Sequence, residues 1–163
     1  MRHLLATFAL TLLLGLAAGA TPAEESSLVS GMKQRAEPLL YALGLLGSPY
    51  KLGGTDPEKG IDCSGFVRHV YKKTEDIELP HSARAISQNG EVVGKDQLQP
   101  GDLVFFNTLR KPYSHVGIYA GDGKFVHATS SRSKQVMVSD MNQSYWARRF
   151  DGARRVMQSP IGR

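Results

Sequence analysis

The feature that most constrains the fold of this sequence is a change in hydrophobic period midway along the chain. Before about residue 90, apolar side chains recur at helical spacing, whereas after residue 100 they form the short runs and alternations of strands. The expected helices cover residues 39–46, 63–74 and 82–88, and the expected strands cover 103–106, 116–119, 125–128, 135–139 and 154–157. Helices followed by a mainly antiparallel sheet predict an α+β domain.

Residues 1–20 have the pattern of a secretory signal peptide. Arg2 supplies a positive start, an uncharged apolar run follows, and Ala18-Gly19-Ala20 fits a small-x-small cleavage site. A retained membrane anchor is the weaker interpretation, because a spanning helix needs about 20 apolar residues and this run is shorter. We expect cleavage after Ala20, a periplasmic or secreted protein, and no stable membrane anchor after cleavage.

The rest of the chain has the length of one domain with one core. Residues 21–38 are expected to form a small, polar lead-in segment that is mobile over 21–30. Residues 39–157 are expected to form the domain, followed by a tail at 158–163. No internal repeat or low-complexity linker divides the sequence, and we expect a monomer.

The chain is moderately basic, with a formal net charge of +5 at pH 7. Four arginines cluster near the C-terminus, at positions 148, 149, 154 and 155. An exported protein without interleaved aromatic and basic residues is not expected to bind nucleic acid. Such a surface would attract an anionic envelope polymer, although an ordinary solvated surface explains the arginines equally well.

Cys63 is the single cysteine of the sequence and lies where a glycine-rich loop meets an expected helix. Asp62 is the expected N-cap, which places Cys63 in the first helical turn. There the unpaired N–H groups and the helix dipole favour an anion, so we expect a thiol pKa below the usual value of about 8.5. A lone cysteine is more often a small buried hydrophobe. The polar, glycine-flanked position favours a nucleophile instead.

Two histidines are candidates for the base that a cysteine nucleophile needs. His115 and His127 flank an expected hairpin turn at Gly121-Asp122-Gly123, and a hairpin centred on Gly121 would set them face to face, with Cβ atoms roughly 5 Å apart. A turn centred on Asp122-Gly123 would shift this register. The other candidates are weaker, because His69 points away from Cys63 on the same helix and His81 lies in a loop.

Other uses of the same three residues are less consistent with the sequence. Zinc binding by Cys63, His115 and His127 matches no usual ligand spacing and offers only one sulfur, so we expect neither a metal nor a cofactor. A degenerate binding module is also open, but the nucleophile and base residues are both present.

Five motifs follow one another between residues 47 and 128. They are Gly47-Ser48-Pro49-Tyr50-Lys51-Leu52-Gly53-Gly54, Asp62-Cys63-Ser64-Gly65-Phe66-Val67, Leu98-Gln99-Pro100-Gly101-Asp102-Leu103-Val104-Phe105-Phe106, His115-Val116-Gly117-Ile118-Tyr119 and Phe125-Val126-His127-Ala128. Together they resemble the NlpC family of cell-wall cysteine peptidases. The resemblance covers roughly residues 45–156, with all motifs in the family's order.

The resemblance implies a compact papain-like domain with Cys63 as nucleophile, His115 as base and His127 as the polar third member. By the same resemblance, Tyr50 helps to hold the oxyanion. Asp62 and Ser64 line the substrate cleft, where a carboxylate can meet a stem-peptide amine. Aromatic packing for Tyr50 and helix capping for Asp62 and Ser64 are the structural alternatives.

One departure from the family pattern is His81, which follows Leu79-Pro80 where the family leads us to expect arginine. It bears on substrate contacts and not on the chemistry.

The function that this resemblance implies is hydrolysis of peptidoglycan stem peptides, with the favoured bond between D-glutamate and the diamino acid. Two alternatives stay open. One is an N-acetylmuramoyl-L-alanine amidase with the same machinery, and the other is a noncatalytic wall-binding regulator.

Overall fold

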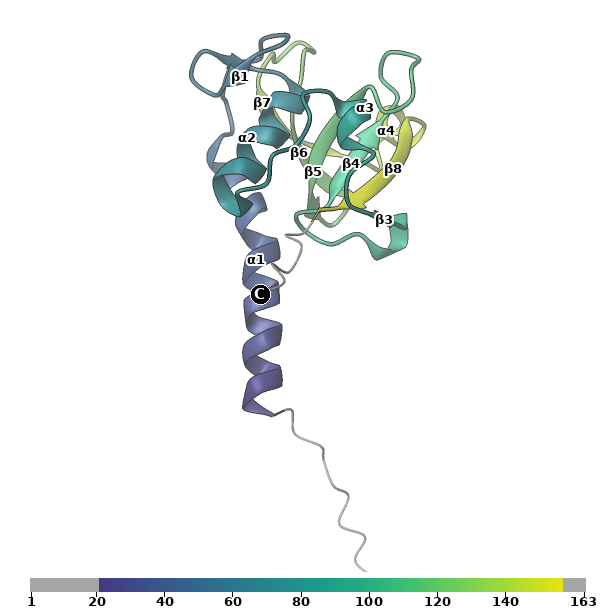
Figure 1. The fold of residues 1–163 in the computed structure, drawn as a ribbon. Coiled ribbons are helices and arrows are strands. Elements are labelled where there is room, and N and C mark those ends of the chain that lie inside the picture. Colours follow the sequence, from purple (N-terminus) through teal and green to yellow (C-terminus); the bar gives the residue numbers. More distant parts are fainter. Residues whose placement is uncertain (1–20, 157–163) are drawn as a thin grey trace, which may run out of the picture.

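The computed structural model describes residues 21–156, which form helices packed on an antiparallel sheet (Figure 1). The helices and strands in chain order are α1 (Pro22–Gly44), β1 (Thr55–Asp56), β2 (Gly60–Ile61), α2 (Cys63–Glu75), α3 (Ala83–Ile86), β3 (Glu91–Val93), the 3-10 turn η1 (Lys95–Gln97), β4 (Leu103–Phe106), β5 (His115–Gly121), β6 (Lys124–Ala128), β7 (Val136–Asp140), α4 (Ser144–Ala147) and β8 (Phe150–Arg155). The expected α+β class is confirmed.

The main sheet has six strands in the order β3-β8-β4-β5-β6-β7, and every neighbouring pair is antiparallel. Strands β4 and β5 lie in the centre, where all four residues of β4 are buried. Strand β7 is the last strand on one side. Strands β1 and β2 form a separate small hairpin just before α2.

The sheet has a hydrophobic cluster on each face. Helices α1 and α2 contact β5 and β6 on one face, where Phe66, Val67 and Val70 of α2 are fully buried. Phe106, Phe125 and Trp146 belong to the cluster on the other face. Burying each large side chain contributes about 1.5–3 kcal/mol, so both faces stabilise the sheet that carries the histidines.

Helix α1 begins far earlier than the sequence pattern predicts. The expected helix over 39–46 coincides, as far as Gly44, with the end of a helix that starts at Pro22, and the expected lead-in over 21–38 is helical from Pro22 onward. Proline suits the first position of a helix, and the good helix formers that follow extend it without a hydrophobic stripe to signal it. Figure 1 shows the N-terminal part of α1 projecting from the body of the domain.

The other expected elements differ from the observed ones mainly at their ends. Ser82 caps α3 as expected, since its Oγ accepts a hydrogen bond from the Ala85 N–H at 3.1 Å. The expected strand over 154–157 begins earlier, at Phe150. The signal peptide at 1–20, position 157 and the tail at 158–163 lie outside the described residues.

Candidate active site

The N-terminus of α2 is fixed by the carboxylate of Asp62. One oxygen, Oδ1, accepts hydrogen bonds from the Gly65 N–H at 2.7 Å and the Ser64 hydroxyl at 2.9 Å. The other, Oδ2, accepts from the Gly53 N–H at 2.9 Å. Asp62 is therefore the N-cap that the sequence predicts, and it also ties the preceding glycine-rich loop to the helix.

Two glycines let this loop lie directly against the start of α2. A Cβ on Gly65 would collide with the Gly54 carbonyl oxygen, and one on Gly54 would collide with the carbonyl of Gly60. The Gly54 carbonyl also accepts a hydrogen bond from the Asp62 N–H at 3.0 Å. The backbone around Cys63 is therefore held by contacts between residues that are close in sequence.

Cys63 is the first residue of α2, as expected, and is partly exposed. Its sulfur lies near the backbone N–H groups of Val116, Ser64 and Cys63 itself, which favour the thiolate. Burial and the Asp62 carboxylate outweigh these donors and raise the pKa of the thiol to about 11. The expected lowering of this pKa is therefore wrong, because desolvation of the thiolate exceeds the favourable field at the helix start.

His115 and His127 come together, although by a different register from the one we favoured. The hairpin pairs Ile118 with Val126 and turns at Asp122-Gly123, with an irregularity near its end. Continuing that register places Gly117 opposite His127, and a Cβ on Gly117 would lie 3.1 Å from the His127 Cβ. His115 is thus a diagonal neighbour on the same face, within reach of a ring.

The two imidazoles form a direct hydrogen bond, with 2.8 Å between His115 Nε2 and His127 Nδ1. The rings are nearly perpendicular, at 89°. Because Nε2 of His115 is engaged by His127, its Nδ1 is the nitrogen left to act on a thiol. Burial lowers the pKa of His115 to about 4, and burial together with His115 holds the pKa of His127 well below its usual value. Both rings are therefore neutral near pH 7.

Trp146 covers both imidazoles and was not found by sequence reasoning. Its ring stacks on His115 with centroids 5.5 Å apart and meets His127 edge-on at 5.0 Å. This side chain comes from α4, which follows β7 in the chain. Because α4 is distant in sequence from both histidines, no local sequence pattern connects Trp146 to them. By excluding water from the pair, it contributes to the burial that keeps the rings neutral.

Ser139 on β7 is a second side chain that sequence reasoning missed. Its Oγ lies 2.9 Å from His127 Nε2, the nitrogen that does not face His115. The alternation over 135–139 indicated the strand, but finding this contact also requires the pairing of β6 with β7.

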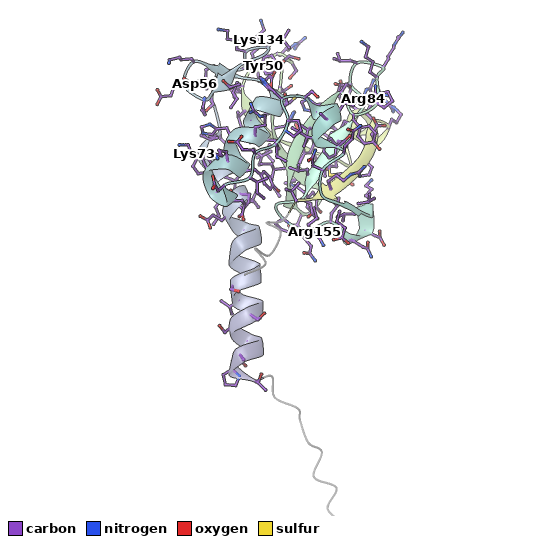
Figure 2. The ribbon with its side chains drawn as sticks, in the orientation of Figure 1. Tyr50, Asp56, Lys73, Arg84, Lys134 and Arg155 are labelled. Atoms are coloured by element: carbon purple, nitrogen blue, oxygen red, sulfur yellow. The ribbon has the colours of Figure 1, made fainter. Side chains whose placement is uncertain are left out.

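The remaining expected site residues are Tyr50 and Ser64. Tyr50 is near Cys63 and Asp62, its hydroxyl hydrogen-bonds to Ser130, and burial is the main cause that raises its pKa. Figure 2 shows Tyr50 beside Lys134, to whose carbonyl its N–H donates at 2.7 Å, at the end of the domain away from Arg155. Ser64 is buried and bonded to Asp62.

The two other histidines of the domain lie outside the pair. The Nε2 of His69 is 3.1 Å from the Tyr41 hydroxyl, between α1 and α2. His81 Nε2 is 4.0 Å from Asp62 Oδ1 and is more exposed. The sequence favours the paired histidines over both as candidate bases, and the positions of both agree with that preference.

A groove of about 530 Å³ opens beside the histidine pair. Its lining mixes polar and apolar side chains, holds no Asp, Glu, Lys or Arg, and contains Thr108, Leu109, His115, His127, Thr129, Ser130, Ser131, Met137, Ser139, Gln143, Tyr145 and Trp146. A few hydroxyl and amide groups set among apolar side chains are typical of a ligand-binding site. Within residues 21–156, no cluster of three or more His, Cys, Asp or Glu is placed to hold a metal ion, and no helix is long and apolar enough to cross a membrane.

The fold and this site define an α+β domain that carries a thiol at a helix N-terminus and a buried histidine pair on the adjoining sheet. The chain belongs to the NlpC/P60 family, which it matches over residues 47–155. Two crystal structures are similar. An NlpC/P60 family protein from Bacillus cereus has a TM-score of 0.69 and 33% identity over 76% of this chain and 40% of that one. The NlpC/p60 domain of the peptidoglycan hydrolase SagA has a TM-score of 0.65 and 30% identity over 75% of this chain and 98% of that one.

Curated relatives that share 43% identity with this chain over 111 residues include the Gamma-DL-glutamyl hydrolase of Bacillus subtilis (strain 168) and the Murein DD-endopeptidase MepS/Murein LD-carboxypeptidase of Escherichia coli (strain K12). The matched part is 68% of this chain in both cases, but only 26% of the first relative and 57% of the second. The similarity is therefore one of domains and does not extend over the whole relatives.

Proposed function

We propose that this protein is a cysteine peptidase that hydrolyses the stem peptides of peptidoglycan. Cys63 is the nucleophile, His115 the base and His127 the group that orients the base. The observation that carries the proposal is the hydrogen bond between His115 Nε2 and His127 Nδ1. Val116, the residue after His115 on β5, has its backbone N–H close to the Cys63 sulfur. Membership of the NlpC/P60 family and the names of the relatives support it.

The reaction begins with attack of the Cys63 sulfur on a peptide carbonyl carbon. The thiol proton passes to His115 Nδ1 as the S–C bond forms, and the carbonyl oxygen becomes an oxyanion held by the Cys63 N–H and the Tyr50 hydroxyl. The C–N bond then breaks and the leaving amine takes the proton from His115. His115 next removes a proton from water, which attacks the thioester and regenerates the thiol.

The raised pKa of Cys63 and the lowered pKa of His115 decide when the proton moves. At neutral pH the resting pair is a thiol beside a neutral imidazole. Proton transfer therefore accompanies attack on the bound substrate and does not precede it. His127 keeps the His115 proton on Nε2, so that Nδ1 presents its lone pair to the thiol.

The favoured bond is the one between D-glutamate and the diamino acid. The γ-glutamyl substrate in the name of the Bacillus subtilis relative supports this choice. A second candidate is the D,D crosslink, because the relatives MepS and MepH are both named murein DD-endopeptidases. Asp62 is the carboxylate expected to meet the amine of a stem peptide. Its two oxygens already accept three hydrogen bonds, so a substrate amine would have to share these oxygens with the present donors.

Digestion of purified peptidoglycan, followed by mass spectrometry, tests the function. Wild-type protein should release fragments with new diamino acid amines and intact sugar chains, and the fragment masses distinguish the two bonds. Peptides freed whole from the sugar would instead identify the amidase. Binding without release of any fragment, in wild type and Cys63→Ala alike, would identify the noncatalytic regulator and contradict the proposal.

Export is part of the same proposal, because a wall substrate lies outside the cytoplasm. The observation behind it is the Ala18-Gly19-Ala20 site after an apolar run. Intact-mass measurement on protein recovered from its host should give an N-terminus at Thr21 and, on a sizing column, a monomer. Recovery of the uncleaved chain from membranes would contradict export with cleavage.

A further inference from the structure

Three side chains at equal sequence separations form a continuous chain of hydrogen bonds across three strands. His115 is bonded to His127 at 2.8 Å, and His127 is bonded to Ser139 at 2.9 Å. We propose that Ser139 is a positioning residue of the site, whose hydroxyl oxygen accepts the Nε2 proton of His127 and thereby fixes the tautomer that His115 requires. The inference rests on the proposed function for the role of His115.

The strand registers place these three side chains on one face of the sheet. His127 is paired with Met137 across β6 and β7, so Ser139 is its diagonal neighbour two residues along. The same diagonal relation joins His115 to His127 across β5 and β6. Side chains two residues apart on a strand share a face, so the relay runs across the strands and ends on β7, the last strand of the sheet.

The positions of the protons follow from what the base must do. To accept the thiol proton on Nδ1, His115 must carry its own proton on Nε2, which then donates to His127 Nδ1. A neutral imidazole has one N–H, so His127 must hold its proton on Nε2. Ser139 Oγ is the partner at that nitrogen and therefore accepts this proton.

The opposite arrangement would disable the base. If the Ser139 hydroxyl donated to His127 Nε2, the His127 proton would sit on Nδ1 and point at His115 Nε2. His115 would then carry its proton on Nδ1, where the lone pair is needed. The low pKa of His127, caused by burial and by His115, removes the third option of a doubly protonated ring near neutral pH.

Ser139 also has room for a conservative replacement. It is partly exposed and lines the groove, while His127 is fully buried. Ser139→Thr keeps the acceptor oxygen and adds a methyl group at a strand position that tolerates β-branching. Ser139→Ala removes the acceptor with little change in volume. Ser144→Ala is the matched control, because Ser144 is exposed and does not line the groove.

The experiment compares wild type with these three variants in three measurements: kcat and KM for a stem peptide, the pH profile of iodoacetamide alkylation of Cys63, and the imidazole 15N NMR tautomers. Ser139→Ala should lower kcat about tenfold, the effect of about one lost hydrogen bond, with KM nearly unchanged. It should also slow alkylation and introduce the Nδ1–H form of His127. Ser139→Thr should restore all three, and Ser144→Ala should match wild type.

Each outcome decides the inference. A wild-type His127 protonated on Nδ1 overturns it even if Ser139→Ala fails to fold, and so does a folded Ser139→Ala with wild-type kcat, alkylation and tautomers. A wild type that cleaves no stem peptide refutes the proposed function. The positioning role would then still stand on the tautomer and alkylation results, so the two failures are distinguishable.

Discussion

Cys63 and His115 are positioned by different kinds of structure. Cys63 is held by residues close to it in sequence: the Asp62 cap, and a glycine loop that packs against the helix start. His115 is held by His127 on β6, which is bonded in turn to Ser139 on β7, and by stacking on Trp146 of α4. The side of the proposed nucleophile therefore depends on local backbone geometry, whereas the side of the proposed base depends on strand register. Substitutions around Cys63 and substitutions around His115 should therefore differ in their effects on activity and on stability.

The largest effect is expected from removing either reacting group. Cys63→Ala and His115→Ala should each lower kcat/KM by about 10⁴-fold or more, because each step of acyl transfer passes through both groups. Chromatographic assay of released stem peptides measures the loss. His69→Ala is the matched control, since His69 bonds to Tyr41 outside the site and should leave the rate unchanged. Residual activity of Cys63→Ala within tenfold of wild type would remove Cys63 as nucleophile.

A smaller loss, about 10²–10³-fold, is expected for His127→Ala. The change removes the acceptor for the His115 Nε2–H and leaves a cavity beneath Trp146. His127→Asn retains an acceptor oxygen and should keep more activity. The measurement is kcat/KM for both variants, with folding checked by circular dichroism. If folded His127→Ala equals wild type across the pH range, another group orients His115.

The buried pair of His115 and His127 should also limit the stability of the protein in acid. His115 and His127 have folded pKa values below the unfolded value of about 6.5, so the unfolded state binds protons first as the pH falls. The stabilisation from these two neutral histidines is therefore fully present above about pH 6.5. It decreases as the pH falls below that value, until His115 itself becomes protonated in the folded state at about pH 4. The loss is about 1.4 kcal/mol per pH unit for each histidine. Urea titrations between pH 7 and pH 4.5 measure it.

The matched control for this acid effect is the His115→Asn/His127→Asn double variant. It should lose less stability than wild type over the same interval, because the two buried bases are gone. Equal losses in both proteins would mean that other groups cause the acid sensitivity.

The smallest effect is expected on the nucleophile's side, from Asp62→Asn. Losing the charged cap and its bond to the Gly53 N–H should lower the free energy of unfolding by about 1–2 kcal/mol. The same change removes a charge that raises the pKa of Cys63. The midpoint of the alkylation rate–pH curve should therefore move to lower pH, yet stay above that of a model thiol, because burial is the larger cause. A midpoint that moves upward would contradict this assignment.

The same contrast explains what the sequence could predict. The Asp62 cap, the start of α2 at Cys63 and the Ser82 cap depend on neighbouring residues, and all three are confirmed. The α+β class follows from hydrophobic period and is confirmed as well. The favoured hairpin register was wrong, because a glycine-rich turn permits more than one alignment and only the packing of whole strands selects one.

What escaped prediction on the base's side depends on contacts between distant residues. Ser139 and Trp146 reach the histidines only once β7 and α4 are placed. The thiol pKa was predicted in the wrong direction for a related reason: the helix start is local, but the burial that outweighs it comes from the assembled domain. The start of α1 escaped because its first turns carry no apolar stripe.

The most direct test of the account is the protonation state of the resting pair at neutral pH. NMR titration of labelled wild-type protein can follow the His115 imidazole nitrogens and the Cys63 Cβ together. The account predicts a neutral His115 protonated on Nε2 at pH 7 that titrates near pH 4, beside a Cys63 that remains a thiol beyond pH 9. A thiolate beside a doubly protonated His115 at pH 7 would contradict it.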